Sequence, residues 1–336
     1  MALLLRESHL RELLVMRDLI PLMAQTLAGF STGGAVQPVR SMVPVERHGG
    51  FLGVMPAYLA PSAPPAGPDS TEALGLKAVA FYPGNAGRSL PTHLATVLLL
   101  DPATGALRAL LDGRLITEMR TAAVSAAATD RLARRGARVL AVLGAGVQAR
   151  SHIEALREVR PPAEVRVWNR TQASADRLAS DTRARFGLTV AVSASAEQAV
   201  RGAEIVCTVT GSTAPVVEEP WLSPGTHLNA VGAARPDWRE LTTGVVRRAK
   251  LFVDSRAAAL TEAGDVIGPI REGAITEGHI AAEIGEVFAG RHAGRERDGD
   301  ITLFKSVGMA VEDVATARFA FARAEARGIG EEIRLE

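Results

Sequence analysis

The hydrophobic residues in the first third of the chain are spaced first as in a helix and then as in strands. Apolar side chains recur with a helical period over residues 8–30, which predicts an amphipathic helix. Short apolar runs follow and predict strands at 36–45, 50–59, 76–82, 96–101 and 107–113. The turn sequence Asp-Pro-Ala-Thr-Gly separates the last two runs, so a meandering sheet with hairpins is expected. The Pro-rich stretch 61–70 is predicted to be an exposed loop.

From Thr121 onward, apolar strands alternate with helical segments. The alanine-rich residues 120–134 are helical by propensity. Strands are predicted at 138–144, 164–170, 188–194, 204–210, 227–233 and 250–255, and helices at 147–159, 171–186 and 306–328. Strands that are apolar on both faces and alternate with helices indicate a parallel sheet covered on both sides. The charged stretch 291–300 is expected to be a loop.

Composition narrows the class of protein. A length of 336 residues favours two domains, and 47% hydrophobic with 22% charged residues is typical of a globular protein. The net charge of +1, without a basic block, argues against nucleic-acid binding. The single cysteine, Cys207, lies in an apolar run and is predicted to be buried, which suits a reducing cytoplasm. Early charges argue against a signal peptide, and no 18-residue apolar stretch predicts a membrane span.

Residues 144–149 read Gly-Ala-Gly-Val-Gln-Ala, which is G-x-G-x-x-A between a predicted strand and a predicted helix. In this pattern the first glycine allows a tight turn, the second lets a pyrophosphate approach the backbone, and Ala149 lets the helix pack closely on the strand. The helix N-terminus then offers free N–H groups to the phosphates. The candidate cofactor-binding residues of this turn are Gly144, Ala145, Gly146, Val147 and Gln148.

The end of the second strand bears on the choice of cofactor. An NAD site usually carries Asp or Glu there, but this chain has Asn169, Arg170 and Thr171. Arg170 can pair with a 2′-phosphate, and its two neighbours can donate hydrogen bonds, so NADPH is favoured. Alternatively, Arg170 and Thr171 merely begin the next helix, with Thr171 as its N-cap.

Six motifs together resemble the ornithine cyclodeaminase/μ-crystallin family over nearly the whole chain: VQPVR…GVMPAY, RTAAVSA, GAGVQA, WNRT, NAVGAARPDWREL and FKSVGMAVED. The resemblance is strongest to the μ-crystallin branch, whose members are NADPH-dependent ketimine reductases and, in vertebrates, thyroid-hormone binders. It implies an α/β fold with a Rossmann-type doubly wound parallel sheet at 121–310. Residues 1–120 and 311–336 would form a smaller α+β domain for substrate binding and dimerisation, and the protein would be a homodimer through its N-terminal sheets.

Three basic residues match the substrate-carboxylate positions of that family: Arg40, Lys77 and Arg120. Each is a charge among apolar residues, and buried charges require a partner, which an anionic substrate would supply. Taken singly, each is instead a solvated or internally paired charge. Lys77 is also the best candidate for the catalytic proton donor, because an ammonium group can titrate; a Glu or a His side chain is the alternative.

Further cofactor contacts are implied by the same resemblance. The family places the Thr92–His93 pair near the nicotinamide, and an ordinary residue at the start of a strand is an equally good interpretation of His93. Thr208 and Thr210 end one strand, Val231 and Gly232 end the next, and Ser306, Val307 and Gly308 are expected to open the last helix over the nicotinamide. Glu262 and Asp265 are interpreted as possible plain helix-end residues.

One position departs from the cyclodeaminase pattern. Ornithine cyclodeaminases carry an Asp at the end of a Gly-Gly-Asp or Gly-Ala-Asp triplet, where it is implicated in acid/base work. This chain has Gly232-Ala233-Ala234, and Asp237 lies three residues further on. The chain thus keeps the cofactor and carboxylate positions but lacks one group expected of a cyclodeaminase.

The sequence therefore predicts an NADPH-dependent reductase of imines next to a carboxylate, with no metal site. Its small-molecule substrates would be cyclic ketimines, or imines formed from a 2-oxo acid and an amine. One alternative is an ornithine cyclodeaminase or an alanine-type dehydrogenase of the same fold. Another is a non-catalytic protein that binds NADPH and a small ligand, as thyroid-hormone carriers do.

Overall fold

The computed structural model describes residues 2–61 and 72–334. The chain forms two compact units, one from residues 1–120 with 309–336 and the other from residues 121–308. The first boundary falls inside helix α3 (Gly113–Leu132), and the second lies two residues before the expected limit of 310. Of the predicted loop 61–70, all but the first residue lie outside the described residues.

The first unit is built on an eight-stranded, mostly antiparallel sheet. Its strands are β1 (Ala2–Leu5), β2 (Ala35–Val36), β3 (Ser41–Val45), β4 (Gly50–Leu59), β5 (Ala73–Phe81), β6 (His93–Leu100), β7 (Leu107–Asp112) and β16 (Glu331–Ile333). Strands β4 to β7 pair in sequence order, which confirms the predicted meander. In the last hairpin Asp101 Oδ1 accepts hydrogen bonds from the N–H groups of Ala103 and Thr104, each at 3.0 Å. The edge strand β16 and its neighbour β1 were not expected from the sequence.

The predicted helix 8–30 is wrong as a single element. It is divided into α1 (Glu7–Leu13) and α2 (Met16–Ser31), whose axes are bent by 88°. Leu14 and Val15 between them are extended, with ψ of 127° and 144°. Buried apolar residues lie on both sides of the break, so the spacing of apolar residues does not reveal it.

The predicted strand 36–45 is also divided, into β2 and β3. Pro38 lies between the two strands and has no N–H group to donate to a continuous ladder. Both strands nevertheless pair with β4, so the stretch returns to the same neighbour after the interruption.

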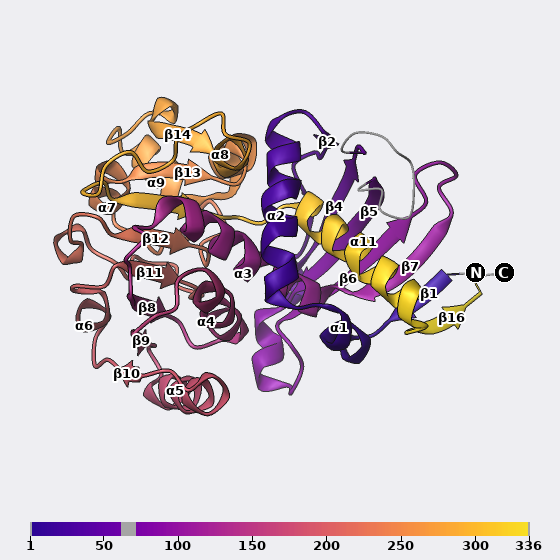
Figure 1. The fold of residues 1–336 in the computed structure, drawn as a ribbon, viewed down its shortest axis with the longest axis horizontal. Helices are drawn as coiled ribbons and strands as arrows, with labels where there is room; N and C mark the ends of the chain where they lie inside the picture. Colours follow the sequence, from indigo (N-terminus) through magenta and orange to yellow (C-terminus); the bar gives the residue numbers. More distant parts are fainter. Residues whose placement is uncertain (1, 62–71, 335–336) are drawn as a thin grey trace. The chain divides into compact units, whose positions relative to one another are not determined.

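A single helix covers one face of this sheet. The helix α11 (Ala310–Arg327) packs against β4, β5 and β6, and α2 packs against α11 (Figure 1). Met55, Lys77 and Val97 are neighbours across these three strands, and all are buried on the covered face. Because successive side chains of a strand alternate, the even-numbered residues of these strands point to the opposite face.

The second unit is built on an eight-stranded sheet in which all paired strands are parallel. The strands are β8 (Val139–Leu143), β9 (Glu164–Trp168), β10 (Val190–Val192), β11 (Ile205–Thr208), β12 (His227–Ala230), β13 (Lys250–Val253), β14 (Ile280–Glu283) and β15 (Thr302–Lys305). Their order is β10-β9-β8-β11-β12-β15-β13-β14. The order reverses between β8 and β11, and such a switch point is where doubly wound sheets bind ligands.

Helices cover both faces of this sheet. They are α4 (Val147–Val159), α5 (Gln172–Phe186), α6 (Ala196–Val200), α7 (Thr243–Arg248), α8 (Arg256–Glu262), α9 (Gly264–Arg271) and α10 (Ile284–Phe288), together with α3. Leu228 and Ala230 of β12 pack in one buried cluster with α6 to α9. Between them, Asn229 points to the other face and donates to Thr129 of α3 at 2.8 Å. The predicted class, a Rossmann-type doubly wound sheet with a smaller α+β unit, is confirmed.

Several limits differ from the prediction. The helix α3 begins at Gly113 rather than near Arg120, and the last helix begins at Ala310 rather than at Ser306. Strands β14 and β15 and the short helices α6 to α10 were not predicted, because runs of four to eight residues carry little periodicity. Four single 3₁₀ turns complete the described elements: Glu46–His48, Pro83–Gly87, Glu219–Trp221 and Glu277–His279.

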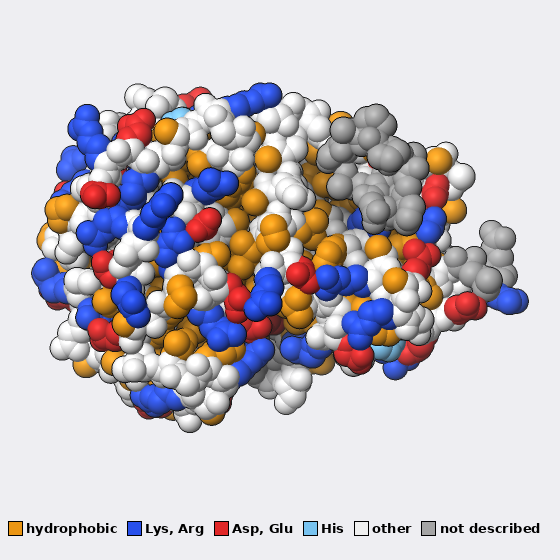
Figure 2. Space-filling view, in the orientation of Figure 1, with side chains coloured by type: hydrophobic (Ala, Val, Ile, Leu, Met, Phe, Trp, Pro, Cys, Tyr) orange, Lys and Arg blue, Asp and Glu red, His pale blue; other side chains and the backbone are white. Residues whose placement is uncertain are grey.

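Three further observations bear on the expectations from composition. Cys207 is fully buried, as predicted. No single helix of the described residues is long and apolar enough to cross a membrane; α1 and α2 meet that criterion only as a bent pair. On the face shown in Figure 2, Lys and Arg side chains are interspersed with Asp and Glu over each unit.

Candidate functional site

A glycine turn joins β8 to α4 at the switch point of the parallel sheet. Gly144 has φ of +117° and donates its N–H to Trp168 O at 2.8 Å. A Cβ on this residue would lie 2.7 Å from Val209 O, so the turn requires glycine for its backbone angle and for its close approach to the next loop. Ala149 is fully buried, and its small side chain lets α4 lie close to the sheet.

The start of α4 fits the pyrophosphate of a dinucleotide. Gly146 is the N-cap, and a Cβ built on it would meet nothing within 4 Å, so its backbone faces open space. The first N–H groups of the 13-residue helix have no partner within the helix and lie at the positive end of its dipole. Ala145 and the exposed Val147 complete the turn. Gln148 Oε1 is buried without a hydrogen-bond partner among the described residues, which suits a bound group that donates.

The end of β9 presents polar residues to solvent. Asn169 follows the strand directly and donates from Nδ2 to Thr171 O at 3.0 Å, which shapes the turn. Thr171 is the N-cap of α5, but its hydroxyl makes no capping hydrogen bond. Arg170 is exposed and makes no ion pair with any described residue. The hydroxyl and the guanidinium are therefore both available to a ligand, as the NADPH interpretation requires.

Glu240 holds together the ends of two central strands. Its Oε2 accepts hydrogen bonds from the Thr208 hydroxyl at 2.8 Å and from the Gly232 N–H at 2.7 Å. Its Oε1 accepts from both the N–H and the hydroxyl of Thr210, each at 2.7 Å. Burial raises the pKa of Glu240, and the positive charge of Lys305 opposes that rise. Thr208 thus uses its hydroxyl proton on Glu240, at the carboxyl edge where a cofactor contact was predicted.

Asp265 in turn holds Glu240. Its Oδ1 accepts from the N–H groups of Glu240 at 2.8 Å and Leu241 at 2.9 Å, and its Oδ2 lies 3.1 Å from Lys305 Nζ. Both Asp265 and Lys305 are fully buried. Asp265 does lie at a helix end, in the first turn of α9, but its partners there give it a further structural part, because a carboxylate buried without partners would be too costly. Glu262 does lie at the end of α8.

The turn after β15 is fixed by another buried carboxylate. Asp254 Oδ2 accepts from the Ser306 hydroxyl at 3.2 Å and from the N–H groups of Val307 at 2.7 Å and Gly308 at 2.8 Å. Gly308 has φ of +77°. These residues do not open the last helix, as predicted, but form the connection before it. The three hydrogen bonds to Asp254 and the left-handed glycine hold the backbone out of a helix.

Val231 and the departure at Ala234 lie beyond β12. Val231 continues the ladder by donating its N–H to Thr208 O at 2.9 Å. Asp237, the nearest later carboxylate, is exposed and lies 3.3 Å from Arg235.

Lys77 and Arg120 meet on the covered face of the first unit. Lys77 Nζ lies 2.6 Å from Asp313 Oδ2 and donates to Thr117 Oγ1 at 3.2 Å. Arg120 donates from Nε to Asp313 Oδ1 at 2.9 Å and from Nη1 to Glu312 Oε2 at 2.5 Å. The exposed fractions of Lys77 and Arg120 are only 2% and 4%, and those of both acids are zero. The structure thus brings together Lys77 and Arg120, two of the three residues predicted to bind the substrate carboxylate.

The acids of α11 correct one expectation from the sequence, which concerns the partners of the buried cations. The expectation was that a substrate would supply the partner of these buried cations, but Glu312 and Asp313 already do so. Burial lowers the pKa of Lys77 to about 8, and the Asp313 carboxylate opposes that shift, whereas Arg120 and Arg40 add to it. Arg40 therefore lies close enough to Lys77 for its charge to be felt.

His93 belongs to the same neighbourhood. It begins β6, as predicted, and its ring packs against that of Phe81 at a tilt of 48°, with the centroids 4.5 Å apart. Surrounding protein atoms and the charge of Lys77 lower its pKa, although the side chain remains accessible to solvent. Thr92 Oγ1 lies 3.4 Å from His93 Nδ1. A neutral imidazole at physiological pH follows from these surroundings.

Sequence reasoning missed the carboxylates that organise both units. They are Glu240, Asp254, Asp265, Glu312 and Asp313. Four of them, Asp254, Asp265, Glu312 and Asp313, lie within or beside apolar runs, which was a usable signal because a buried charge requires partners. Glu240 lies between Arg239 and Leu241 and carries no such signal. The described residues contain no group of three or more His, Cys, Asp and Glu side chains arranged to hold a metal.

The fold and the site together define the class of protein. It is a two-unit α/β protein with a Rossmann-type sheet and a glycine turn at the switch point of that sheet. The chain belongs to the ornithine cyclodeaminase/μ-crystallin family, whose model matches residues 2–328.

Individual relatives resemble the chain over nearly its whole length. The ketimine reductase μ-crystallin of Mus musculus is 46% identical over 319 residues, which cover 94% of each chain. The Δ¹-pyrroline-2-carboxylate reductase of Thermococcus litoralis, solved with NADH and L-proline, has a TM-score of 0.94 and 41% identity over 98% of this chain and 100% of the other. An archaeal alanine dehydrogenase dimer with bound NAD has a TM-score of 0.92 and 32% identity over 100% and 99%.

The glycine turn yields a matched pair of substitutions. Gly144→Ala forces a side chain into left-handed backbone and against Val209 O, so the free energy of unfolding should fall by about 1–3 kcal/mol or more. Gly146→Ala meets open space and should cost no more than about 1 kcal/mol, as expected at an N-cap. Its methyl group should nevertheless weaken NADPH binding by about tenfold, because it projects where the pyrophosphate approaches.

Urea unfolding measures the first effect, and titration of NADPH against protein fluorescence measures the second. Unchanged NADPH binding in folded Gly146→Ala would contradict the assignment of this turn to the pyrophosphate.

Proposed function

We propose that the protein is an NADPH-dependent reductase of imines whose carbon carries a carboxylate. The observation that carries this proposal is the buried cluster of Lys77 and Arg120, paired with Asp313 and Glu312, with Arg40 nearby. Among these five side chains three cations stand against two carboxylates, and this excess of positive charge suits a small anionic substrate. The glycine turn of the second unit supports a dinucleotide cofactor. The reductases among the relatives act, by their names, on ketimines and on pyrroline-2-carboxylate, which are imines of this kind.

The roles of the residues follow from their charges. The bound nicotinamide would supply a hydride to the imine carbon. Arg40 and Arg120 would hold the substrate carboxylate and so orient the C=N bond, which is a large part of the catalysis of such a step. Lys77, with a pKa lowered to about 8, is close to the ideal range for a group that gives up a proton near neutral pH.

The function is tested by following NADPH oxidation with a panel of imines. Cyclic ketimine carboxylates, and pyruvate mixed with methylamine or ammonia, should be reduced, whereas a matched cyclic imine without the carboxylate should react far more slowly. Ammonia release from ornithine with NAD would instead support a cyclodeaminase. NADPH binding without oxidation by any of these imines would support a ligand-binding protein.

Substitutions of Lys77 separate its two predicted roles, which are binding of the substrate carboxylate and donation of a proton. Lys77→Ala should lower kcat/KM for a carboxylate-bearing imine by about tenfold to a hundredfold, which corresponds to losing about 1.5–3 kcal/mol. Lys77→Arg keeps the charge but cannot deliver a proton near neutral pH, so kcat should stay low while KM recovers. Lys250→Ala, at a half-exposed lysine paired with Glu296 and Asp300, is the control. Full activity of Lys77→Ala would refute the assignment.

The preference for NADPH rests on this chain's own residues, because the two solved relatives above hold NADH and NAD. Arg170 is exposed at the end of β9, where the ribose of a dinucleotide lies in this fold, and no carboxylate occupies the strand end. Asn169 and Thr171 flank it with further donors. A 2′-phosphate at this place gains a charge-assisted pair and meets no repulsion.

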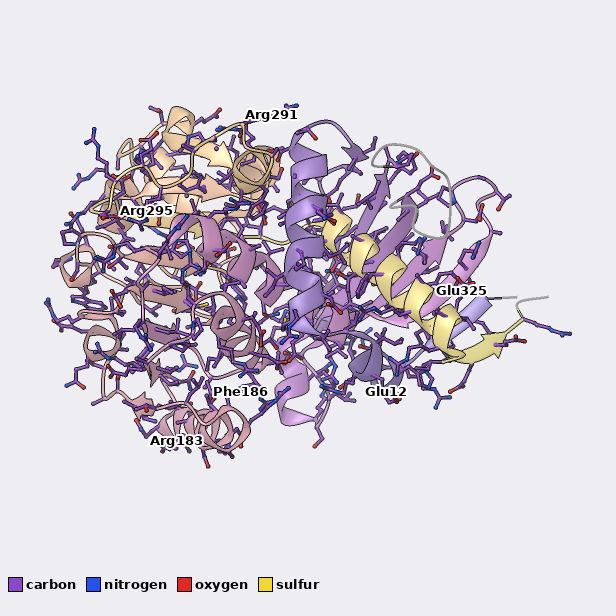
Figure 3. The ribbon with its side chains drawn as sticks, in the orientation of Figure 1. Glu12, Arg183, Phe186, Arg291, Arg295 and Glu325 are labelled. Atoms are coloured by element: carbon purple, nitrogen blue, oxygen red, sulfur yellow. The ribbon has the colours of Figure 1, made fainter. Side chains whose placement is uncertain are left out.

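Arg170→Ala should therefore weaken NADPH binding by about tenfold to a hundredfold and leave NADH binding nearly unchanged. Arg185→Ala is the control; it lies at the other end of α5, the end that Arg183 and Phe186 mark in Figure 3, and it pairs with Glu154. The measurement is the Michaelis constant for each cofactor. If the unsubstituted protein uses NADPH and NADH equally well, the proposed preference for NADPH is rejected.

We also propose a homodimer formed through the open face of the first unit's sheet. Val43, Leu52, Ala80 and Leu94 are successive neighbours across β3, β4, β5 and β6, and three of them are 38–53% exposed. The helix α11 packs against the other face, so this apolar row faces away from it. A second copy of the chain is the occupant that fits, because the alanine dehydrogenase relative is itself a dimer.

Light scattering at micromolar concentration should give the mass of a dimer for the parent protein. Leu52→Arg combined with Leu94→Arg places two charges in the row and should give a folded monomer, because both positions are exposed within one chain. Val15→Arg, at an exposed apolar residue between α1 and α2, should leave the dimer intact. A monomeric parent would overturn the proposal.

A further inference from the structure

The ammonium group of Lys77 has polar and charged neighbours from several elements of the first unit. Asp313 of α11 forms an ion pair with it at 2.6 Å, and Glu312 on the same helix pairs with Arg120. Helix α3 contributes Thr117, which accepts a hydrogen bond from Lys77, and Arg120. Arg40, before β3, repels the ammonium, and His93 of β6 lies close enough to feel the charge of Lys77.

Among these groups, Asp313 is the one carboxylate that the structure places in contact with Lys77 Nζ. Burial, Arg120 and Arg40 all favour the neutral amine, because each makes a positive charge at Nζ more costly. Asp313 favours the ammonium, and its carboxylate is itself fixed by a second hydrogen bond, from Arg120 Nε. Its position in the first turn of α11 is also where a helix favours a negative charge.

We propose that Asp313 is a positioning residue that keeps Lys77 protonated and aimed, so that Lys77 can give a proton to the imine nitrogen near neutral pH. This inference rests on the proposed function for the identity of the acceptor. Asp313 acts through Lys77 and need not touch the substrate.

A bound NADPH would supply the hydride and be oxidised to NADP⁺. The hydride and its electron pair form the new C–H bond, and the π bond of C=N breaks toward nitrogen. The nitrogen takes the proton from the Lys77 ammonium, which leaves a secondary amine on the product and a neutral amine on Lys77. Water returns a proton to Lys77 before the next turnover. The Asp313 carboxylate stays ionised throughout and makes the charged form of Lys77 the resting form.

The chain offers a direct measurement, because Lys77, Lys250 and Lys305 are its three lysines. In protein labelled with ¹³C-lysine, the three side-chain Cε signals can be followed against pH and assigned with Lys250→Arg and Lys77→Arg. The parent Lys77 signal should titrate near pH 8. In Asp313→Asn its midpoint should fall by about one to three pH units, the effect of removing an adjacent opposite charge.

Glu325→Gln is the matched control. Glu325 lies on the same helix near its other end, labelled in Figure 3, and pairs with the half-exposed Arg108 at 3.4 Å. This variant should leave the Lys77 midpoint unchanged. A midpoint that is also unchanged in Asp313→Asn would overturn the proposal.

Removing Asp313 alone leaves Lys77 and Arg120 with one fewer carboxylate, so the single variant is expected to be less stable than the parent protein. Asp313→Asn combined with Arg120→Gln restores the charge balance of the cluster. Its Lys77 midpoint should still lie below the parent value, because Asp313 acts more strongly on Lys77 than Arg120 does. A midpoint at or above the parent value in this folded double variant would likewise overturn the proposal.

The second measurement is the pH profile of kcat/KM with a carboxylate-bearing cyclic ketimine. A proton donor must be protonated, so activity should fall as the pH rises through the Lys77 midpoint. In Asp313→Asn that falling limb should move to lower pH by the same amount as the Lys77 signal, and at pH 8 the rate should drop by about fivefold or more. If kcat/KM falls equally at every pH and the falling limb of the profile stays in place, Asp313 has only a structural role. That result would overturn the proposal.

The two measurements separate this inference from the function on which it rests. A parent protein that oxidises NADPH with none of the imines rejects the proposed function and with it the proton transfer. The lysine titration uses no substrate, so it decides independently whether Asp313 keeps Lys77 protonated.

Discussion

A charge removed from water must find an opposite charge or a full set of hydrogen bonds, and both units are organised by that constraint. In the second unit Glu240 accepts four hydrogen bonds from the ends of two strands, and Asp265 accepts two and faces Lys305. In the first unit Asp313 and Glu312 neutralise Lys77 and Arg120. Each buried carboxylate therefore fixes the position of loops or side chains that would otherwise move.

This arrangement serves rigidity more than net stability. Pairing two buried charges roughly offsets the cost of removing them from water, whereas removing one partner is strongly destabilising. The threonines and Gly232 around Glu240 are thereby held at the carboxyl edge of the sheet, next to the strand that precedes the glycine turn. A site held in this way needs little reorganisation when a ligand binds, which is the condition that efficient catalysis requires.

The parts of the structure that the sequence predicted share a local signal. The strand–glycine–helix pattern at 144–149 is contiguous, as is the meander of β4 to β7, and both were recovered close to their observed limits. The break at Leu14 and Val15 was missed because the spacing of apolar residues continues across it. Asp313 lies 236 positions from Lys77 in the chain, so their contact depends on how α11 packs on the sheet, which no local pattern encodes.

The pleat of β5 relates the charged cluster to the open face of the sheet. Lys77 points to the face that α11 covers, and there it meets Asp313. Leu76 and Ala78, its neighbours in sequence, must point the other way, toward the face with the exposed apolar row. A slip of one residue in the pairing of β5 would carry Lys77 to the open face and put leucine against the acids of α11. The Lys77–Asp313 ion pair and the apolar row therefore specify the same register from opposite faces of one strand.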